Sequence, residues 1–357
     1  MASIEAYETK KGLKLWRVRY RRPDGKSTDK SGFRTKREAT LWLNNLEVAK
    51  SEGNYINPAA GKATVRDLGT AWMARQADWK PSYRYTMEST WETHVLPKWG
   101  DYQVSKITRA DVQEWVAGLD RSRSVTSRCV TILSSILDDA VADSLIHSNR
   151  ATNIALPKTS KKPRVYLDHK QVEAFAIAAG ENGVIIRTLA YTGLRWGELA
   201  GLHGPDVDTV GRRIHVNRNA VQVGSRIVVG TPKTHELRTV PIPAFLAVEL
   251  LERVGEGIVF PSRAGGYQRA PRASEAKRSW WRTAVLESGI PDVTPHGLRH
   301  TAASLAIQAG AHVKAVQRML GHSSAAMTLD RYSALFDSDL EAVASALEGS
   351  RARALVK

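Results

Sequence analysis

Two short stretches that combine Pro with Gly, Ala or Lys interrupt the chain, at residues 55–63 and 157–164. Neither stretch has helical or strand periodicity, and such breaks are typical of linkers. At 357 residues the chain exceeds the length that one core comfortably serves. We therefore expect three units, over residues 1–60, 64–157 and 165–350.

The first unit has the pattern of a small sheet followed by one helix. Residues 7–35 alternate polar and apolar side chains in short runs, with a turn signal at Pro23-Asp24-Gly25. Apolar residues then recur at helical spacing over residues 35–54. We predict about three strands and one helix, with basic side chains exposed on the strands. The basic candidates for binding a partner through this unit are Lys14, Arg17, Arg19, Arg21 and Arg22.

The second unit has only helical patterns. Thr64-x-x-Asp67 and Thr108-x-x-Asp111 both have the form of a capping box, which marks the start of a helix. Further apolar periodicity predicts helices near residues 81–94, 108–118 and 124–143. The Lys- and Pro-rich break that follows is interpreted as a hinge between two domains, and a plain surface loop is an equal alternative on this stretch alone. Its Lys161 and Lys162 are further basic candidates for binding a partner.

The third unit mixes helices with short strands. Asp168 with Gln171 three residues later predicts the start of a helix, and helical patterns continue to about Leu202. Strand-like runs follow near residues 213–217, 226–229 and 237–242. We expect Lys233 on a hairpin turn between the last two runs. From Thr294 onward the pattern is helical again, so the whole chain is predicted to be mainly α with small β-sheets, an α+β protein.

The charge of the chain favours a polyanionic partner. Lys and Arg number 52 against 36 Asp and Glu, which gives a formal net charge of +16 and a pI near 10.0. Residues 1–37 alone hold twelve Lys or Arg and four Asp or Glu, or half of the net charge. Each phosphate that a basic side chain neutralises releases counterions and adds affinity, so nucleic acid is the expected partner. Excess Lys that serves only solubility remains the alternative on charge alone.

Cysteine usage and hydropathy point to a soluble protein of a reducing cytoplasm. Cys129 is the only cysteine, so no disulfide can form within the chain. The N-terminus has no apolar signal core, and no apolar run approaches the roughly 18 residues that a membrane span needs. We expect no membrane partner. We also find no Walker-type glycine loop or dinucleotide fingerprint, and predict no cofactor and no metal.

Four short motifs in the second half of the chain carry the side chains that phosphodiester chemistry needs. They are Thr192-Gly193-Leu194-Arg195-Trp196-Gly197-Glu198, Gly230-Thr231-Pro232-Lys233-Thr234, Pro295-His296-Gly297-Leu298-Arg299-His300, and Leu320-Gly321-His322 with Tyr332 ten positions later. In their order, residue pattern and spacing, these motifs resemble the signature boxes of the tyrosine recombinases, the phage integrase family. The candidate catalytic residues are Arg195, Lys233, His296, Arg299, His322 and Tyr332.

The chemistry of a phosphodiester explains why these residue types matter. Its charge repels nucleophiles, and its alkoxide leaves poorly unless it is protonated. Arg195 and Arg299 suit charge neutralisation, because a guanidinium offers forked donors and keeps its charge. His296, Arg299 and His300 are three and four positions apart, so one helical face can present all three. Singly, each of these residues is ordinary, and their joint occurrence carries the prediction.

The resemblance implies a role for each candidate. Tyr332 is the nucleophile, His296 its base, and His322 a hydrogen-bond donor to the phosphate. Lys233 is the general acid for the departing 5′-oxygen. Two supporting residues are expected: Glu198 to orient Arg195 or a catalytic His, and His300 to buttress its helix. Trp280 and Trp281 could contact DNA, but core packing is favoured for both.

The resemblance also implies an architecture and partners. The first unit is similar to arm-binding domains, the second to core-binding domains, and the third to the catalytic domain of larger phage integrases. Double-stranded DNA with core and arm sites is the expected partner, and the basic candidates of the first unit and of the hinge are the expected DNA contacts. The implied location is the cytoplasm of a bacterial host, at the nucleoid. A homotetramer would form the synapse, helped by a DNA-bending host factor and an excisionase, and the helical pattern after Tyr332 could dock on a neighbouring protomer. The implied function is integration or excision of a phage or mobile element through a 3′-phosphotyrosine.

Four alternatives stay open at this point. A type IB topoisomerase would use the same covalent chemistry, but the extra basic unit argues against it. A Xer-like resolvase resembles only the last two units. A DNA-binding regulator without catalysis fits the composition but leaves the six residues unexplained. A metal-dependent nuclease is suggested by His296-x-x-x-His300, although position 297 is Gly and no carboxylate cluster accompanies it.

Overall fold

The computed structural model describes residues 2–23, 25–51, 62–158, 164–231, 237–271, 279–326, 329, 332 and 340–355. Tertiary contacts divide the chain into two compact units, Met1–Ser160 and Lys161–Lys357. This boundary falls inside the predicted hinge at residues 157–164. The further division of the first unit near residue 60 stays a prediction.

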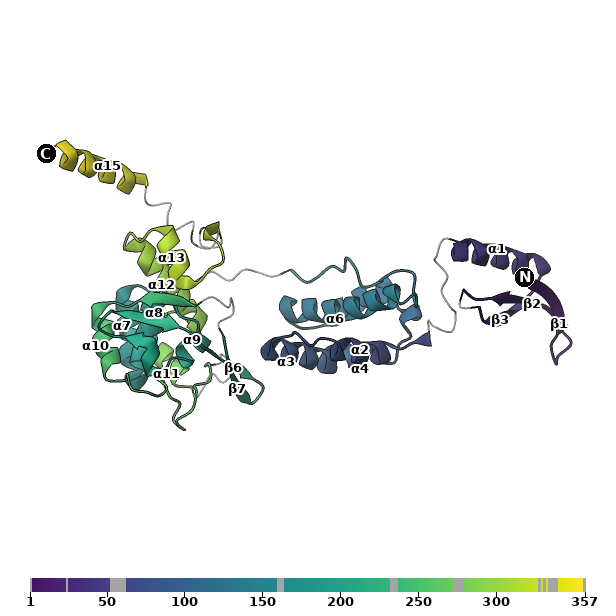
Figure 1. Cartoon of the computed structure of the whole chain (residues 1–357), viewed down its shortest axis with the longest axis horizontal. Helices are drawn as coiled ribbons and strands as arrows, with labels where there is room; N and C mark the ends of the chain where they lie inside the picture. Colours follow the sequence, from purple (N-terminus) through teal and green to yellow (C-terminus); the bar gives the residue numbers. More distant parts are fainter. Residues whose placement is uncertain are drawn as a thin grey trace. The chain divides into compact units, whose positions relative to one another are not determined.

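The N-terminal segment folds as a three-stranded antiparallel sheet with one helix, as predicted (Figure 1). Its strands are β1 (Ser3–Glu8), β2 (Lys14–Arg21) and β3 (Ser27–Phe33), followed by α1 (Lys36–Ser51). The sheet begins at Ser3, earlier than the alternation indicated. Val18 and Tyr20 of β2 pack with Ala39 of α1 in a small apolar cluster.

Strand alternation separates the basic candidates of β2 into two groups. Arg17, Arg19 and Arg21 share the face opposite Val18 and Tyr20, because successive strand residues point to opposite sides. Lys14 lies on the same face as Val18 and Tyr20, but it is exposed because it begins the strand. Arg17 and Arg19 form ion pairs of 3.5 Å with Asp29 and Glu5 on the flanking strands, which partly neutralise this face.

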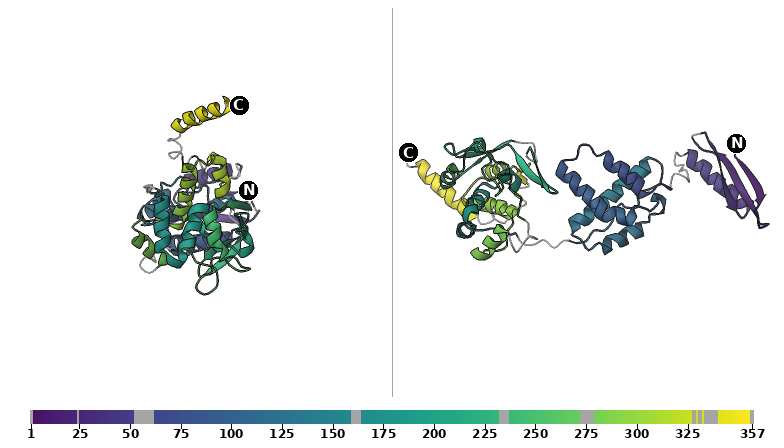
Figure 2. Two further views of the ribbon diagram at one scale, coloured as in Figure 1. Left: turned by 90° about the vertical axis from the view of Figure 1, so that its left-hand side faces the viewer. Right: turned by 90° about the horizontal axis from the view of Figure 1, so that it is seen from below.

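The second half of the first unit is a helical bundle, as predicted. Figure 2 shows these helices, in blue, packed together from a second direction. They surround a core that includes Trp99, Ile132, Leu133, Ile136 and Leu137, all fully buried. The elements are α2 (Val65–Ala74), α3 (Pro81–Thr90), a π-helical turn η2 (Trp91–Val95), α4 (Leu96–Trp99), η3 (Val104–Lys106), α5 (Arg109–Gly118) and α6 (Arg123–Ala142).

The predicted helix starts of this bundle are confirmed by their hydrogen bonds. Thr64 caps α2 by accepting a hydrogen bond from the Asp67 backbone amide. Thr108 and Asp111 form a reciprocal capping box at the start of α5. The single cysteine, Cys129, is buried in the bundle, and burial raises the pKa of its thiol to about 11.

The second unit packs helices against a three-stranded sheet, and a separate two-stranded sheet extends from this body (Figure 1). Its core includes Phe175, Leu189, Leu246 and Trp281, all buried. The helical elements are α7 (His169–Ala178), η4 (Gly180–Asn182), α8 (Gly183–Thr192), α9 (Trp196–Ala200), η5 (Gly204–Asp206), α10 (Ala244–Leu251), α11 (Trp280–Ser288), α12 (Pro295–Gln308), α13 (Val313–Leu320) and α15 (Leu340–Leu355).

Several sequence predictions for this unit are confirmed. Asp168 and Gln171 form the capping box of α7. Pro295 occupies the first turn of α12, and Gly310 follows the helix end with a φ of +78°. Trp281 is buried with its indole N–H donating to the Val293 carbonyl at 2.8 Å, and Trp280 packs partly buried against the same core. Both tryptophans therefore serve packing, as favoured.

The strand pairing differs from the prediction. The strands are β4 (Val207–Asp208), β5 (Arg213–Val216), β6 (Asn219–Val223), β7 (Arg226–Gly230) and β8 (Arg238–Pro241). β8 pairs with β5, whereas β7 pairs with β6 in a separate sheet. The expected hairpin between the last two runs was wrong, because β7 and β8 belong to different sheets. The sequence analysis missed β4 and β6. Their pairing partners are not revealed by alternation within one segment.

We expect the helical bundle to fold by itself, because its core is built from its own helices. Residues 62–158, expressed alone, should unfold in one cooperative transition with urea. Leu133→Ala removes a fully buried side chain and should lower the free energy of unfolding by about 3 kcal/mol. The matched control Thr131→Ala, exposed on the same helix, should change it by less than about 0.5 kcal/mol. Equal effects of the two substitutions would contradict the assigned core.

Candidate active site

A left-handed turn presents Arg195 at the start of α9. α8 ends at Thr192, and Gly193 follows with a φ of +65°, a conformation that favours glycine. A Cβ on Gly193 would lie 2.6 Å from Cδ2 of Leu320, so the backbone of this turn also approaches the end of α13 closely. Arg195 then takes the N-cap position of α9, with its side chain only partly exposed.

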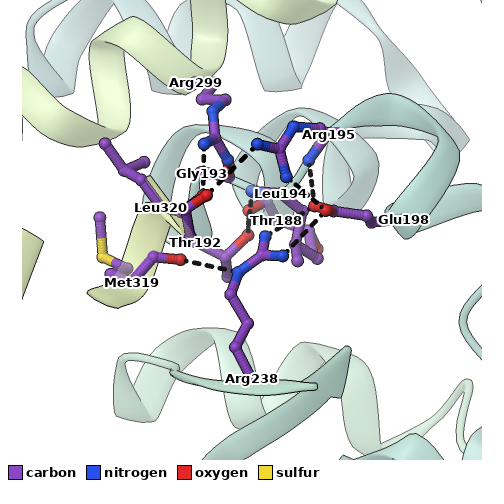
Figure 3. A network of polar contacts seen from close by, with 11 residues as sticks. Thr188, Thr192, Gly193, Leu194, Arg195, Glu198, Arg238, Arg299, Met319 and Leu320 are labelled. Carbon is purple, nitrogen blue, oxygen red and sulfur yellow. Dashed lines mark hydrogen bonds and ion pairs between the residues drawn. The ribbon is translucent and has the colours of Figure 1, made fainter. Parts of the chain in front are cut away.

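Glu198 is the buried acceptor around which the arginines gather (Figure 3). Its carboxylate is 1% exposed and accepts hydrogen bonds of 2.8 Å from both the backbone amide and Nη1 of Arg195. Arg238, from β8, donates Nη1 and Nη2 to the two oxygens of the same carboxylate at 2.8 and 2.7 Å. The predicted contact between Glu198 and Arg195 is therefore present.

The ionisation of Glu198 follows from these partners. Burial by itself disfavours the charged carboxylate and would raise its pKa. The hydrogen bonds and positive charge of Arg238, with the Arg195 contacts, outweigh burial and lower the pKa of Glu198 to about 2. Glu198 is thus a carboxylate throughout the neutral pH range.

Arg299 lies buried on α12 and joins two distant turns. Its side chain is 1% exposed, and it donates Nη1 to the Gly193 carbonyl at 2.6 Å and Nη2 to the Leu320 carbonyl. Arg195 Nη2 lies 3.5 Å from the next carbonyl, that of Gly321. Two guanidinium groups therefore meet at two consecutive carbonyls, as Figure 3 shows in part. Desolvation, with repulsion from Arg195, lowers the pKa of Arg299 to about 9, so it remains charged at neutral pH.

Tyr332 contacts the same helix through its hydroxyl group. Its Oη lies 2.7 Å from Nδ1 of His300, in hydrogen-bonding contact, and its side chain is 1% exposed. The ring packs with Ala303 and Ile307 of α12 and with the end of α13. The ionised form of Tyr332 also acts electrostatically on Arg299 and raises its pKa, so the two groups are neighbours.

The two histidines of α12 lie edge to face. The ring centroids of His296 and His300 are 4.8 Å apart, with an interplanar angle of 80°. His296 is exposed and His300 half-buried. The predicted sharing of one helical face is therefore present. His300 contacts the candidate nucleophile directly, which helical spacing alone did not indicate.

His322 follows the left-handed C-cap Gly321 at the end of α13 and is 6% exposed. Its backbone is held by Gln317, whose carbonyl accepts from the His322 amide at 3.1 Å and whose side chain donates to the His322 carbonyl at 3.0 Å. This anchors the Leu320-Gly321-His322 turn that Arg195 and Arg299 contact.

Three predicted residues, Lys233, Lys161 and Lys162, lie outside the described residues. Arg238 was missed by the sequence analysis, because a lone Arg at a strand start carries no local signal. Within the described ranges, no group of three His, Cys, Asp or Glu side chains is arranged to hold a metal ion. No helix in the described part of the chain is long and apolar enough to cross a membrane.

Comparison with known families agrees with this geometry. Residues 165–339 match the phage integrase family, and residues 64–119 match the N-terminal SAM-like domain of phage integrases. Together the two matches span about two thirds of the chain. The chain belongs to the phage integrase family. It is a site-specific DNA recombinase of the tyrosine class, as the signature boxes indicated.

Individual relatives extend the similarity over nearly the whole recombinase. A putative prophage phiRv2 integrase of Mycobacterium tuberculosis is 28% identical over 347 residues, covering 92% of this chain and 91% of the relative. A Tn1549 transposon integrase bound to transposon right end DNA superposes with a TM-score of 0.66 at 21% identity, covering 79% of this chain and all of that one. A lambda integrase dimer bound to a core site superposes with a TM-score of 0.59 at 18% identity, covering 91% of this chain and 93% of that one. The two structures share the fold of this chain.

We expect Glu198→Gln to destabilise the recombinase in a pH-dependent way. The pKa of Glu198 is about 2 when folded against an ordinary 4.5, so its ionisation stabilises the fold above pH 4.5 and this contribution is lost as pH falls towards 2. Calorimetric unfolding should show a loss of about 3 kcal/mol at pH 7 and less than half of that at pH 3.

The matched control for this substitution is Glu173→Gln. Glu173 forms a half-exposed ion pair with Arg187 at 2.8 Å, and its loss should cost less than about 1 kcal/mol at either pH. Equal destabilisation by Glu198→Gln at pH 7 and pH 3 would show that the charge of Glu198 does not support the fold.

Proposed function

We propose that the recombinase cuts and rejoins DNA strands through a phosphodiester bond to Tyr332. The observation that carries this proposal is the convergence of Arg195 and Arg299 on the Leu320-Gly321 carbonyls, beside a Tyr332 hydroxyl held by His300. Three guanidinium groups surround one carboxylate here, so the cluster keeps a net positive charge that suits a phosphate.

The two arginines neutralise the phosphate in this mechanism. Preorganised cations aimed at developing charge are typically worth about 3 to 4 kcal/mol per donor in comparable sites. Both are fixed before substrate binds, Arg195 by Glu198 and Arg299 by the Gly193 and Leu320 carbonyls. His322, on the same turn, donates a further hydrogen bond to the phosphate in the proposed complex.

Proton transfer completes the reaction at both ends. A free phenol, with a pKa near 10, is only about 0.1% ionised at pH 7, so a tyrosine nucleophile needs a base. The His296–His300 pair supplies it, and His300 is in direct contact with the hydroxyl. As Oη bonds to phosphorus, the bond from phosphorus to the 5′-oxygen breaks, and Lys233 protonates that oxygen. The reverse steps reseal the strand, so the bond energy is retained and no ATP is consumed.

The partners of the recombinase are proposed from its domains and relatives. The 1–60 unit would bind arm sites through the Arg17, Arg19 and Arg21 face, and the remaining units would bind the core site. Related lambda integrase has been seen as a dimer on a core site and a tetramer on a Holliday junction. We propose a homotetramer here too, in which α15 docks on a neighbour, assisted by a DNA-bending host factor and an excisionase.

Tyr332→Phe should abolish covalent attachment and leave specific binding intact. The substitution removes only the nucleophilic oxygen, whereas the ring keeps its packing on α12 and α13. A suitable probe is a duplex selected from a random library by binding to the recombinase, then nicked at successive positions to trap the adduct. Denaturing gels report the adduct, and mobility shifts report binding. The matched control is Tyr191→Phe, which removes a hydroxyl of α8 that is hydrogen-bonded to His169. This variant should form the adduct at the wild-type rate. An adduct in Tyr332→Phe would place the nucleophile elsewhere.

Lys233→Ala should be rescued by a better leaving group. If Lys233 protonates the 5′-oxygen, a substrate with sulfur at that bridging position needs no proton and should be cleaved by the variant at close to the wild-type rate. The all-oxygen substrate should react at least about 100-fold more slowly. Single-turnover adduct formation measures both rates. Failure of the sulfur substrate to restore cleavage would remove Lys233 from the acid role.

A further inference from the structure

All three guanidinium nitrogens of Arg238 donate hydrogen bonds to other groups of the protein. Nη1 and Nη2 bond the two oxygens of Glu198, and Nε donates to the Met319 carbonyl at 3.1 Å. The side chain is only 9% exposed. The forked face of Arg238 is paired with a carboxylate, which neutralises its charge, whereas Arg299 is held by neutral carbonyls. Arg238 therefore acts on a substrate through its neighbours.

The neighbours of Arg238 belong to or adjoin two signature boxes. Glu198 holds Arg195 in the first box. Met319 precedes the Leu320-Gly321-His322 turn, where a Cβ on Gly321 would lie 3.0 Å from Cδ of Arg238. One side chain thus connects α9 with the end of α13.

We propose that Arg238 is a positioning residue of the recombinase: it holds the Glu198 carboxylate against Arg195 and supports the turn that carries His322. The proposal rests on the function proposed above. It adds a residue to the site that touches neither the phosphate nor the nucleophile.

Electrostatics gives the proposal a measurable signature. The charged groups that act with Glu198 are Arg195 on α9, Arg238 on β8 and Arg299 on α12. Arg238 supplies the largest stabilising contribution, so without it burial raises the pKa of Glu198. As pH falls through that raised pKa, Glu198 becomes neutral and Arg195 loses its anchor. A variant without Arg238 should therefore lose activity at acid pH values at which Glu198 of the wild type is still ionised and still holds Arg195.

The experiment measures single-turnover adduct formation against pH with the selected, nicked duplex described above. Arg238→Met should react about 100-fold more slowly than wild type at neutral pH, with DNA affinity nearly unchanged. Protonation of the histidine base slows both proteins towards acid pH, and Arg238→Met should show an added acidic limb beyond this one. Arg238→Lys keeps the charge but not the fork, so it should restore the wild-type pH profile at an intermediate rate. Arg238→Met with Glu198→Gln has no carboxylate to titrate and should lose the added limb.

The control is Arg213→Met, which removes an exposed arginine from the neighbouring strand β5 and should match wild type. If Arg238→Met does not fold, the Arg238→Lys profile and the double variant carry the test. A wild-type rate in Arg238→Met would overturn the proposal. So would a reduced rate with an unchanged pH profile, which would make Arg238 merely structural. Absence of any adduct in wild type would instead remove the proposed function itself, and the proposal with it.

Discussion

The catalytic unit depends on one buried carboxylate shared by two guanidinium groups. An unpaired carboxylate at 1% exposure would be strongly unfavourable, and Glu198 is tolerated because Arg195 and Arg238 satisfy both of its oxygens. The pairing brings α9 together with β8, two elements that are 40 positions apart in sequence at these residues. Through Arg238 it also reaches the end of α13.

Backbone carbonyls provide the second half of this arrangement. Those of Gly193, Met319, Leu320 and Gly321 all accept from arginines of the cluster. They are available because Gly193 and Gly321 adopt left-handed conformations at the ends of α8 and α13. Arginine fixed by neutral carbonyls keeps its positive charge uncompensated. The cluster therefore remains electrostatically incomplete until an anion binds, which is the condition that a phosphodiester would meet.

The sequence predicted features that depend on neighbours along the chain. The capping boxes at Thr108 and Asp168 were correct, since a cap is a matter of residues three positions apart. The hairpin between β7 and β8 was wrong, because these strands, adjacent in the sequence, belong to different sheets. Arg238 was missed for a related reason: its partners lie 40 and 81 positions away, and nothing beside it marks them.

The sequence by itself determined the family of the chain, its mainly helical architecture and the identity of the candidate catalytic side chains. Those conclusions rest on short motifs and on periodicity, which are local properties. Only the tertiary structure decided that Glu198 is clamped by a second arginine, that Arg299 bonds carbonyls of two separate turns, and that Tyr332 meets His300. These are contacts between distant segments, and they form because packing of α8, α12 and α13 around a common core brings the segments together.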